Sequence, residues 1–112
     1  MDTLKEMLKE ELNYAMSLRE HYENILKVFP RGSLSHKQIK GRLYTYLQHR
    51  EGEKVIGRLL SPEESESYRA EFERRNEYKR LLKETNEKIE FIRKALSGRS
   101  KRQKKEQIHV DK

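Results

Sequence analysis

The sequence predicts an α+β fold in which two long amphipathic helices flank a three-stranded antiparallel β-meander. Apolar residues recur at steps of three and four near both ends of the chain, whereas the period is two in the middle, from Gly32 to Leu60. The two helices carry apolar stripes, so we expect them to pack as an antiparallel hairpin. We expect one α+β domain over residues 1–97, followed by a basic tail over residues 98–112.

The first helix is expected from about residue 3 to about residue 29. Thr3 and Glu6 have the spacing of a capping box, and Pro30 with Gly32 stops the helix. Its apolar residues fall on one stripe: Leu4, Leu8, Leu12, Ala15, Leu18, Tyr22, Ile25 and Phe29.

The second helix is expected over residues 62–97. Ser61 can cap it, Pro62 fits the first helical position, and Glu64 can reach back to the cap amide. Its stripe is interrupted by Arg75 and Thr85 and consists of Tyr68, Phe72, Arg75, Tyr78, Leu82, Thr85, Ile89, Ile92 and Leu96. Such a seam needs a partner helix, which is either the first helix or a helix of a second chain in a homodimer.

Three strand-length runs lie between the helices, at Ser33–Ile39, Arg42–His49 and Glu53–Leu60. Lys40-Gly41 and Glu51-Gly52 are typical of hairpin turns, so the runs predict a meander. Alternation along the middle strand places Leu43, Thr45 and Leu47 on one side, and Arg42, Tyr44, Tyr46 and Gln48 on the other.

The net charge of +7 is concentrated in two parts of the chain. Residues 30–60 carry +5 and residues 98–112 carry +4, whereas residues 2–29 carry −2 and residues 61–97 are neutral. Clustered Lys and Arg gain by releasing counterions from phosphates, so this distribution favours a surface that faces a polyanion.

The candidate binding residues are the basic side chains of the meander and tail and two tyrosines of the middle strand. Tyrosine rings stack on bases while Lys and Arg neutralise phosphate. An equally weighted alternative is that Tyr44 and Tyr46 pack on the helices. The candidates are Lys37, Lys40, Arg42, Tyr44, Tyr46, Arg50, Lys54, Arg58, Arg99, Lys101, Arg102, Lys104 and Lys105.

Other classes of function have little support. The four histidines are scattered without metal-ligand spacing, and the absence of cysteine excludes disulfides and Cys-based zinc sites. We therefore expect no enzyme activity, no metal and no cofactor. No apolar run approaches the length of a membrane span, and the first residues lack a signal-peptide core, so we expect a cytoplasmic protein without a membrane partner.

Several short motifs support a resemblance. Gly32-Ser33-Leu34, Tyr44-Thr45-Tyr46-Leu47, Arg50-Glu51-Gly52-Glu53-Lys54 and Leu59-Leu60, followed by a charged helix, resemble a family of short bacterial proteins associated with mobile elements. About residues 30–80 are also similar to the meander near the start of some insertion-sequence transposases and to the arm-type DNA-binding meander of tyrosine recombinases. The latter resemblance implies that Arg42, Tyr44, Lys54 and Arg58 would enter a groove. The sequence differs in predicting a long helix before the meander, and we expect no attached catalytic domain.

Three hypotheses of function follow, of which the third is a purely structural coiled-coil dimer. The first is a non-enzymatic module whose meander and tail bind DNA or RNA, alone or within a nucleoprotein complex. The alternative is an accessory or inhibitor subunit that docks on an acidic protein surface or on a nucleic-acid enzyme. In the second case, Arg75 and Thr85 would specify the pairing of the helices.

Overall fold

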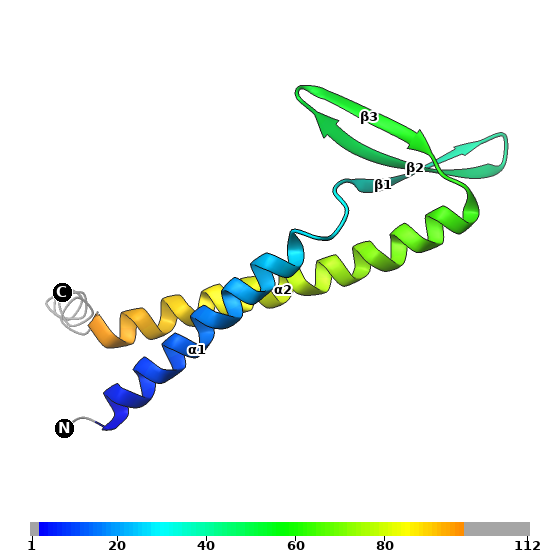
Figure 1. Cartoon of the computed structure of the whole chain (residues 1–112). Helices are drawn as coiled ribbons and strands as arrows, with labels where there is room; N and C mark the ends of the chain where they lie inside the picture. The colour runs from blue at the N-terminus through cyan, green and yellow to red at the C-terminus, as the bar shows by residue number, and fades with distance from the viewer. Residues whose placement is uncertain (1–2, 98–112) are drawn as a thin grey trace, which may run out of the picture. The chain divides into compact units, whose positions relative to one another are not determined.

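The computed structural model describes residues 3–97 and contains two helices and one sheet (Figure 1). The elements in chain order are α1 (Thr3–Leu26), β1 (Ser33–Ile39), β2 (Arg42–Glu51), β3 (Lys54–Leu59) and α2 (Pro62–Ser97). The sheet is antiparallel with the strand order β1-β2-β3. The predicted α+β class and the meander are confirmed.

The described residues belong to two compact units. The helical unit combines α1 up to Asn24 with α2 from Lys79 onward, and the sheet unit comprises Ile25–Tyr78. The expectation of a single domain stays a prediction.

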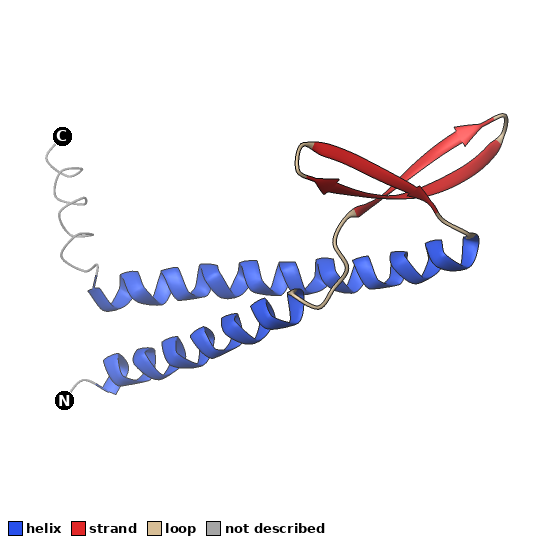
Figure 2. Cartoon of the chain, turned by 45° about the horizontal axis from the view of Figure 1, so that its top comes forward, coloured by secondary structure: helices blue, strands red, loops and turns tan. Residues whose placement is uncertain are grey.

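The core of the helical unit is the seam between α1 and the C-terminal half of α2, which run antiparallel (Figures 1 and 2). Ala15 of α1 and Ile89 and Ile92 of α2 are at most 3% exposed. Thr85 is also buried, and its hydroxyl donates to the Leu81 carbonyl at 2.8 Å, so this polar group is satisfied within its own helix. The predicted stripes are therefore paired within one chain.

Polar contacts border this seam. Lys88 Nζ lies 2.9 Å from Glu11 Oε1, and Arg93 Nη2 lies 4.0 Å from Met16 Sδ. Both contacts involve exposed side chains, so we assign most of the stabilisation to apolar burial rather than to these polar contacts.

The start of α2 is a complete capping box, as predicted. The Ser61 amide donates to Glu64 Oε1 at 3.0 Å, and the Glu64 amide donates to Ser61 Oγ at 3.1 Å. The hydrogen bond from the Ser61 amide, followed by that from Arg58, lowers the pKa of Glu64. Because the pKa is lower in the folded state, this stabilisation is present above the unfolded-state pKa and is lost as the pH falls through the folded-state pKa.

The chain between the helices makes two two-residue hairpin turns, the first of them where the sequence predicts it. Lys40 and Gly41 both have positive φ, 51° and 82°, as a two-residue type I′ hairpin requires. The second loop is Gly52-Glu53, one residue later than expected, because β2 continues to Glu51. Gly52 has φ 64° at the first loop position, where a type II′ turn needs glycine.

The first helix ends at Leu26, three residues before its expected end. The Val28 amide donates to the Ile25 carbonyl at 3.1 Å, which closes a final turn. Phe29 is therefore outside the helix and contacts Tyr78 within the sheet unit, with the ring centroids 5.9 Å apart.

We predict that Ile89→Ala lowers the free energy of unfolding by about 2–5 kcal/mol, because Ile89 is a fully buried aliphatic side chain. Val28→Ala is the control, since Val28 is 81% exposed and its loss should change stability by less than about 0.5 kcal/mol. Urea unfolding followed by circular dichroism measures both. Equal stability of the parent and Ile89→Ala would show that the seam is not buried.

Candidate nucleic-acid interface

The register of the meander decides which side chains share a face. Directly opposite residues of antiparallel strands point to the same side, and side chains alternate along each strand. Lys37 lies opposite Tyr44, Tyr46 lies opposite Leu59, and Leu47 lies opposite both Leu34 and Arg58. The sheet therefore has two faces of different composition.

We call these the tyrosine face and the leucine face. The tyrosine face consists of Ser33, Ser35, Lys37, Ile39, Arg42, Tyr44, Tyr46, Gln48, Arg50, Val55, Gly57 and Leu59. The leucine face consists of Leu34, His36, Gln38, Leu43, Thr45, Leu47, His49, Glu51, Lys54, Ile56 and Arg58. Residues of the middle strand divide between the faces as the sequence predicts.

Side-chain contacts agree with this assignment. On the leucine face, His36 Nδ1 lies 3.0 Å from Thr45 Oγ1, and His49 Nε2 lies 3.2 Å from Glu51 Oε2. On the tyrosine face, the Lys37 ammonium lies 5.3 Å from the centroid of the Tyr46 ring.

The tyrosine face is purely cationic in its charge. Lys37, Arg42 and Arg50 are exposed on it, and within the described meander no acidic residue shares this face. Tyr44 and Tyr46 lie between these cations on β2 and are half-buried. Each ring thus retains accessible surface beside a cation.

The leucine face has mixed charge, and its cations lie near carboxylates. Arg58 Nη1 lies 3.3 Å from Glu64 Oε2, and Arg58 Nη2 donates to the Tyr68 hydroxyl at 3.5 Å. The hydrogen bond to Glu64 raises the pKa of Arg58. The Arg58 guanidinium therefore stays charged and hydrogen-bonded to Glu64. Lys54 lies directly opposite Glu51 in the register.

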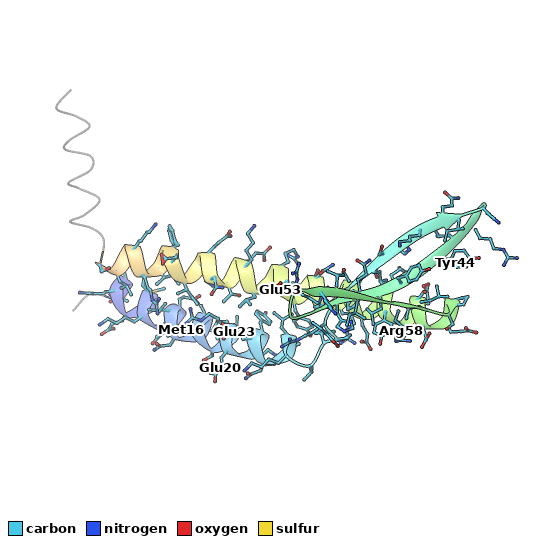
Figure 3. The ribbon with its side chains drawn as sticks, turned by 90° about the horizontal axis from the view of Figure 1, so that it is seen from above. Met16, Glu20, Glu23, Tyr44, Glu53 and Arg58 are labelled. Atoms are coloured by element: carbon cyan, nitrogen blue, oxygen red, sulfur yellow. The ribbon has the colours of Figure 1, made fainter. Side chains whose placement is uncertain are left out.

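The predicted site residues of the meander therefore fall into three groups. Lys37, Arg42, Tyr44, Tyr46 and Arg50 share the tyrosine face, Lys54 and Arg58 lie on the leucine face, and Lys40 lies in the β1–β2 turn. Arg42 and Tyr44 thus lie on the opposite face of the sheet from Lys54 and Arg58, and the entry of these four residues into a groove, implied by the resemblance to arm-type domains, stays a prediction (Figure 3 labels Tyr44 and Arg58). Arg99, Lys101, Arg102, Lys104 and Lys105 lie outside the described residues.

Two apolar side chains of β3 share the tyrosine face: Leu59 lies opposite Tyr46, and Val55 lies opposite Arg50. Val55 is 59% exposed and Leu59 is 53% exposed, and both lie on the tyrosine face of β3. Gly57 lies between them, opposite Gln48, and contributes no side chain. The alternation of Val55, Gly57 and Leu59 is visible in the sequence once the hairpin turn is placed.

The sheet unit is held at its entry by Arg75 of α2. Arg75 Nη1 donates to the Pro30 carbonyl at 3.0 Å and to the Gly32 carbonyl at 2.9 Å. Its guanidinium also lies 4.2 Å from the centroid of the Phe72 ring, an aromatic side chain that is buried. The residue that interrupts the stripe thus binds the chain just before β1, and the hypothesis that Arg75 specifies the pairing of helices stays a prediction.

Gly32 occupies a backbone position that other residues would not tolerate. Its φ is 108°, and a Cβ built there would collide with the carbonyl oxygen of Gln48, the partner of Ser33 in the sheet. The loop before β1 therefore packs closely against the Gln48 carbonyl of β2. Arg75 also binds the carbonyl groups of this loop.

Over residues 3–97, no group of three His, Asp or Glu side chains could hold a metal ion. Within the same residues, no helix is both long and apolar enough to cross a membrane. The chain matches no protein-family model, no curated protein and no solved structure.

We predict that Arg75→Met lowers the free energy of unfolding by about 1.5–3 kcal/mol, because it leaves two carbonyl groups without a charged donor. Arg74→Met is the matched control, since Arg74 is exposed and should lose less than about 1 kcal/mol. Denaturant unfolding of both variants checks this. An equal loss in the two variants would contradict the role of the Arg75 hydrogen bonds.

Proposed function

We propose that this protein is a non-enzymatic nucleic-acid-binding module and that the tyrosine face binds single-stranded nucleic acid. The observation that carries the proposal is the grouping of Lys37, Arg42 and Arg50 with Tyr44 and Tyr46 on a face that has no acidic residue. Cations neutralise phosphates, and tyrosine rings give the bases a surface on which to stack. The basic tail supplies further charge for the same ligand.

The spacing of the tyrosines favours a single strand over a duplex. Side chains two residues apart on a strand are separated by about 6.4–6.8 Å, twice the rise per residue. Successive base pairs of B-DNA are separated by about 3.4 Å. Two neighbouring tyrosines therefore suit bases that have been unstacked and spread apart, and the exposed Val55 and Leu59 offer apolar surface to such bases.

An acidic protein surface is the competing ligand, and it would use this face differently. Its carboxylates would pair with the Lys and Arg side chains, but they would not stack on the two tyrosine rings as bases do. Salt dependence also separates the two, because phosphate binding releases condensed counterions and weakens steeply as salt rises.

We predict that Arg42→Ala with Arg50→Ala weakens binding to an oligonucleotide and lowers the slope of log K against log salt by about 0.7 for each lost phosphate contact. The matched control is Lys54→Ala with Arg58→Ala, which removes the same charge from the leucine face. This control should bind nearly as the parent does. Fluorescence anisotropy over a salt titration measures both, after circular dichroism has verified folding.

Two outcomes of the salt titration count against the proposal. Equal losses in the two double variants would mean that net charge, rather than the tyrosine face, governs binding. Absence of oligonucleotide binding by the folded parent at low salt would overturn the proposed function and favour the acidic protein partner.

We predict that Tyr44→Ala weakens single-strand binding by about 1–3 kcal/mol and leaves duplex binding nearly unchanged, because only unstacked bases can use the ring. Tyr44→Phe should retain the affinity, since it keeps the ring. Tyr14→Ala is the control, because Tyr14 is 59% exposed on α1 and lies in the other unit. If Tyr44→Ala instead lowers the melting temperature and leaves single-strand affinity intact, the ring belongs to the core.

A further inference from the structure

A second surface of α2 lies in the helical unit and borders the buried seam at Leu82. It is an open groove of about 640 Å³, and the residues that matter here are Lys79, Leu82, Lys83, Glu87, Glu90 and Phe91. Phe91 is 66% exposed, although the next residue, Ile92, is 3% exposed. Since residues at steps of three and four share a helical face, Lys79, Lys83, Glu87 and Glu90 form one row outside the seam, which Lys94 extends by one turn.

The groove offers apolar surface in spite of its charged residues. Leu82 and the Phe91 ring contribute to its lining, and the stems of the lysine and glutamate side chains are chains of methylene groups. An exposed aromatic ring beside such a groove is typical of an interaction surface.

The charges of this row have no partners within the described part of the chain. Lys79, Lys83, Glu87 and Glu90 take part in no hydrogen bond or ion pair between residues 3 and 97. Other charged residues of the same helix do, as in the contacts of Arg80 with Glu84 and of Lys88 with Glu11. The unpaired row is therefore available to an external partner.

The order of these charges along the helix makes the groove complementary to itself. Lys79 and Lys83 precede Glu87 and Glu90, and Lys94, which also lines the groove, follows one turn later, where an antiparallel copy centred between Lys83 and Glu87 would place the uncharged Asn76. A second copy of α2 lying antiparallel brings Lys83 opposite Glu87 of the second copy and Lys79 close to Glu90 of the second copy. A two-fold axis repeats each pair, which is the arrangement of an isologous interface.

We propose that this groove is the interface between two copies of the chain, with the two α2 helices antiparallel and Phe91 packed at the contact. The basic tail and a nucleic acid suit the groove less well. The tail carries +4 and would meet the lysines, whereas phosphates would meet Glu87 and Glu90. This inference does not depend on nucleic-acid binding by the sheet.

Analytical ultracentrifugation of the full chain over the micromolar range tests the interface with charge reversals. The parent should form a dimer that dissociates on dilution. Lys83→Glu places a glutamate opposite Glu87 of the second copy, and the two-fold axis repeats this like-charge contact. It should therefore raise the dimer Kd about tenfold or more, and Glu87→Lys should do the same. An equimolar mixture of the two single variants should form a heterodimer, and the doubly reversed variant should regain the parent's Kd.

Two further variants complete the test. Phe91→Ala should weaken the dimer without altering any charge, whereas Lys9→Glu, an equal charge reversal at an exposed site on α1, should leave the Kd unchanged. Circular dichroism verifies that each variant folds. A parent that stays monomeric over the whole range overturns the proposal, as does a dimer that Lys83→Glu and Phe91→Ala leave unaffected, or the absence of a heterodimer in the mixture.

Discussion

The organisation of the sheet unit depends on the contact of Arg75 with the chain that enters β1. One guanidinium nitrogen binds the carbonyl groups of Pro30 and Gly32, and the rest of the group lies against the ring of Phe72. Backbone carbonyl groups in a half-buried loop need donors, and a fixed helical residue supplies them here. Gly32 constrains the position of the same loop, because only glycine fits so close to the Gln48 carbonyl. The start of β1 is fixed in this way, and the two-residue hairpin turns then fix the register of the meander.

The register in turn sorts the charge of the meander into two kinds of surface. Cations of the leucine face have carboxylates nearby, as Arg58 has Glu64, and these contacts belong to the folded structure. Cations of the tyrosine face lie among tyrosines and apolar residues and have no acidic neighbour on that face. A strongly basic segment can thus contain both cations that pair with carboxylates and cations that have no acidic neighbour on their face. The alternation of a strand, rather than the local density of Lys and Arg, distinguishes them.

Much of the fold could be predicted from the sequence because its local signals agree. The capping box at Ser61, the glycines of the two hairpin turns and the change of period from three and four to two all mark boundaries that the structure confirms. The division of the site was also implicit in the sequence. A two-residue hairpin loop pairs even-numbered with odd-numbered residues, so Tyr44 cannot share a face with Arg58. The role of Arg75 could not be predicted, because its acceptors lie more than 40 residues away and carry no side-chain signal.

The central claim is that nucleic acid contacts the tyrosine face, and photo-crosslinking tests it most directly. A single-stranded oligonucleotide with a photoreactive base is bound to the full chain at low salt and irradiated, and the crosslinked residues are identified by mass spectrometry. The account predicts crosslinks at Tyr44 or Tyr46, which fall off as salt rises and compete with unlabelled single strands. Crosslinks confined to the leucine face or to α2, with none on the tyrosine face, would contradict it.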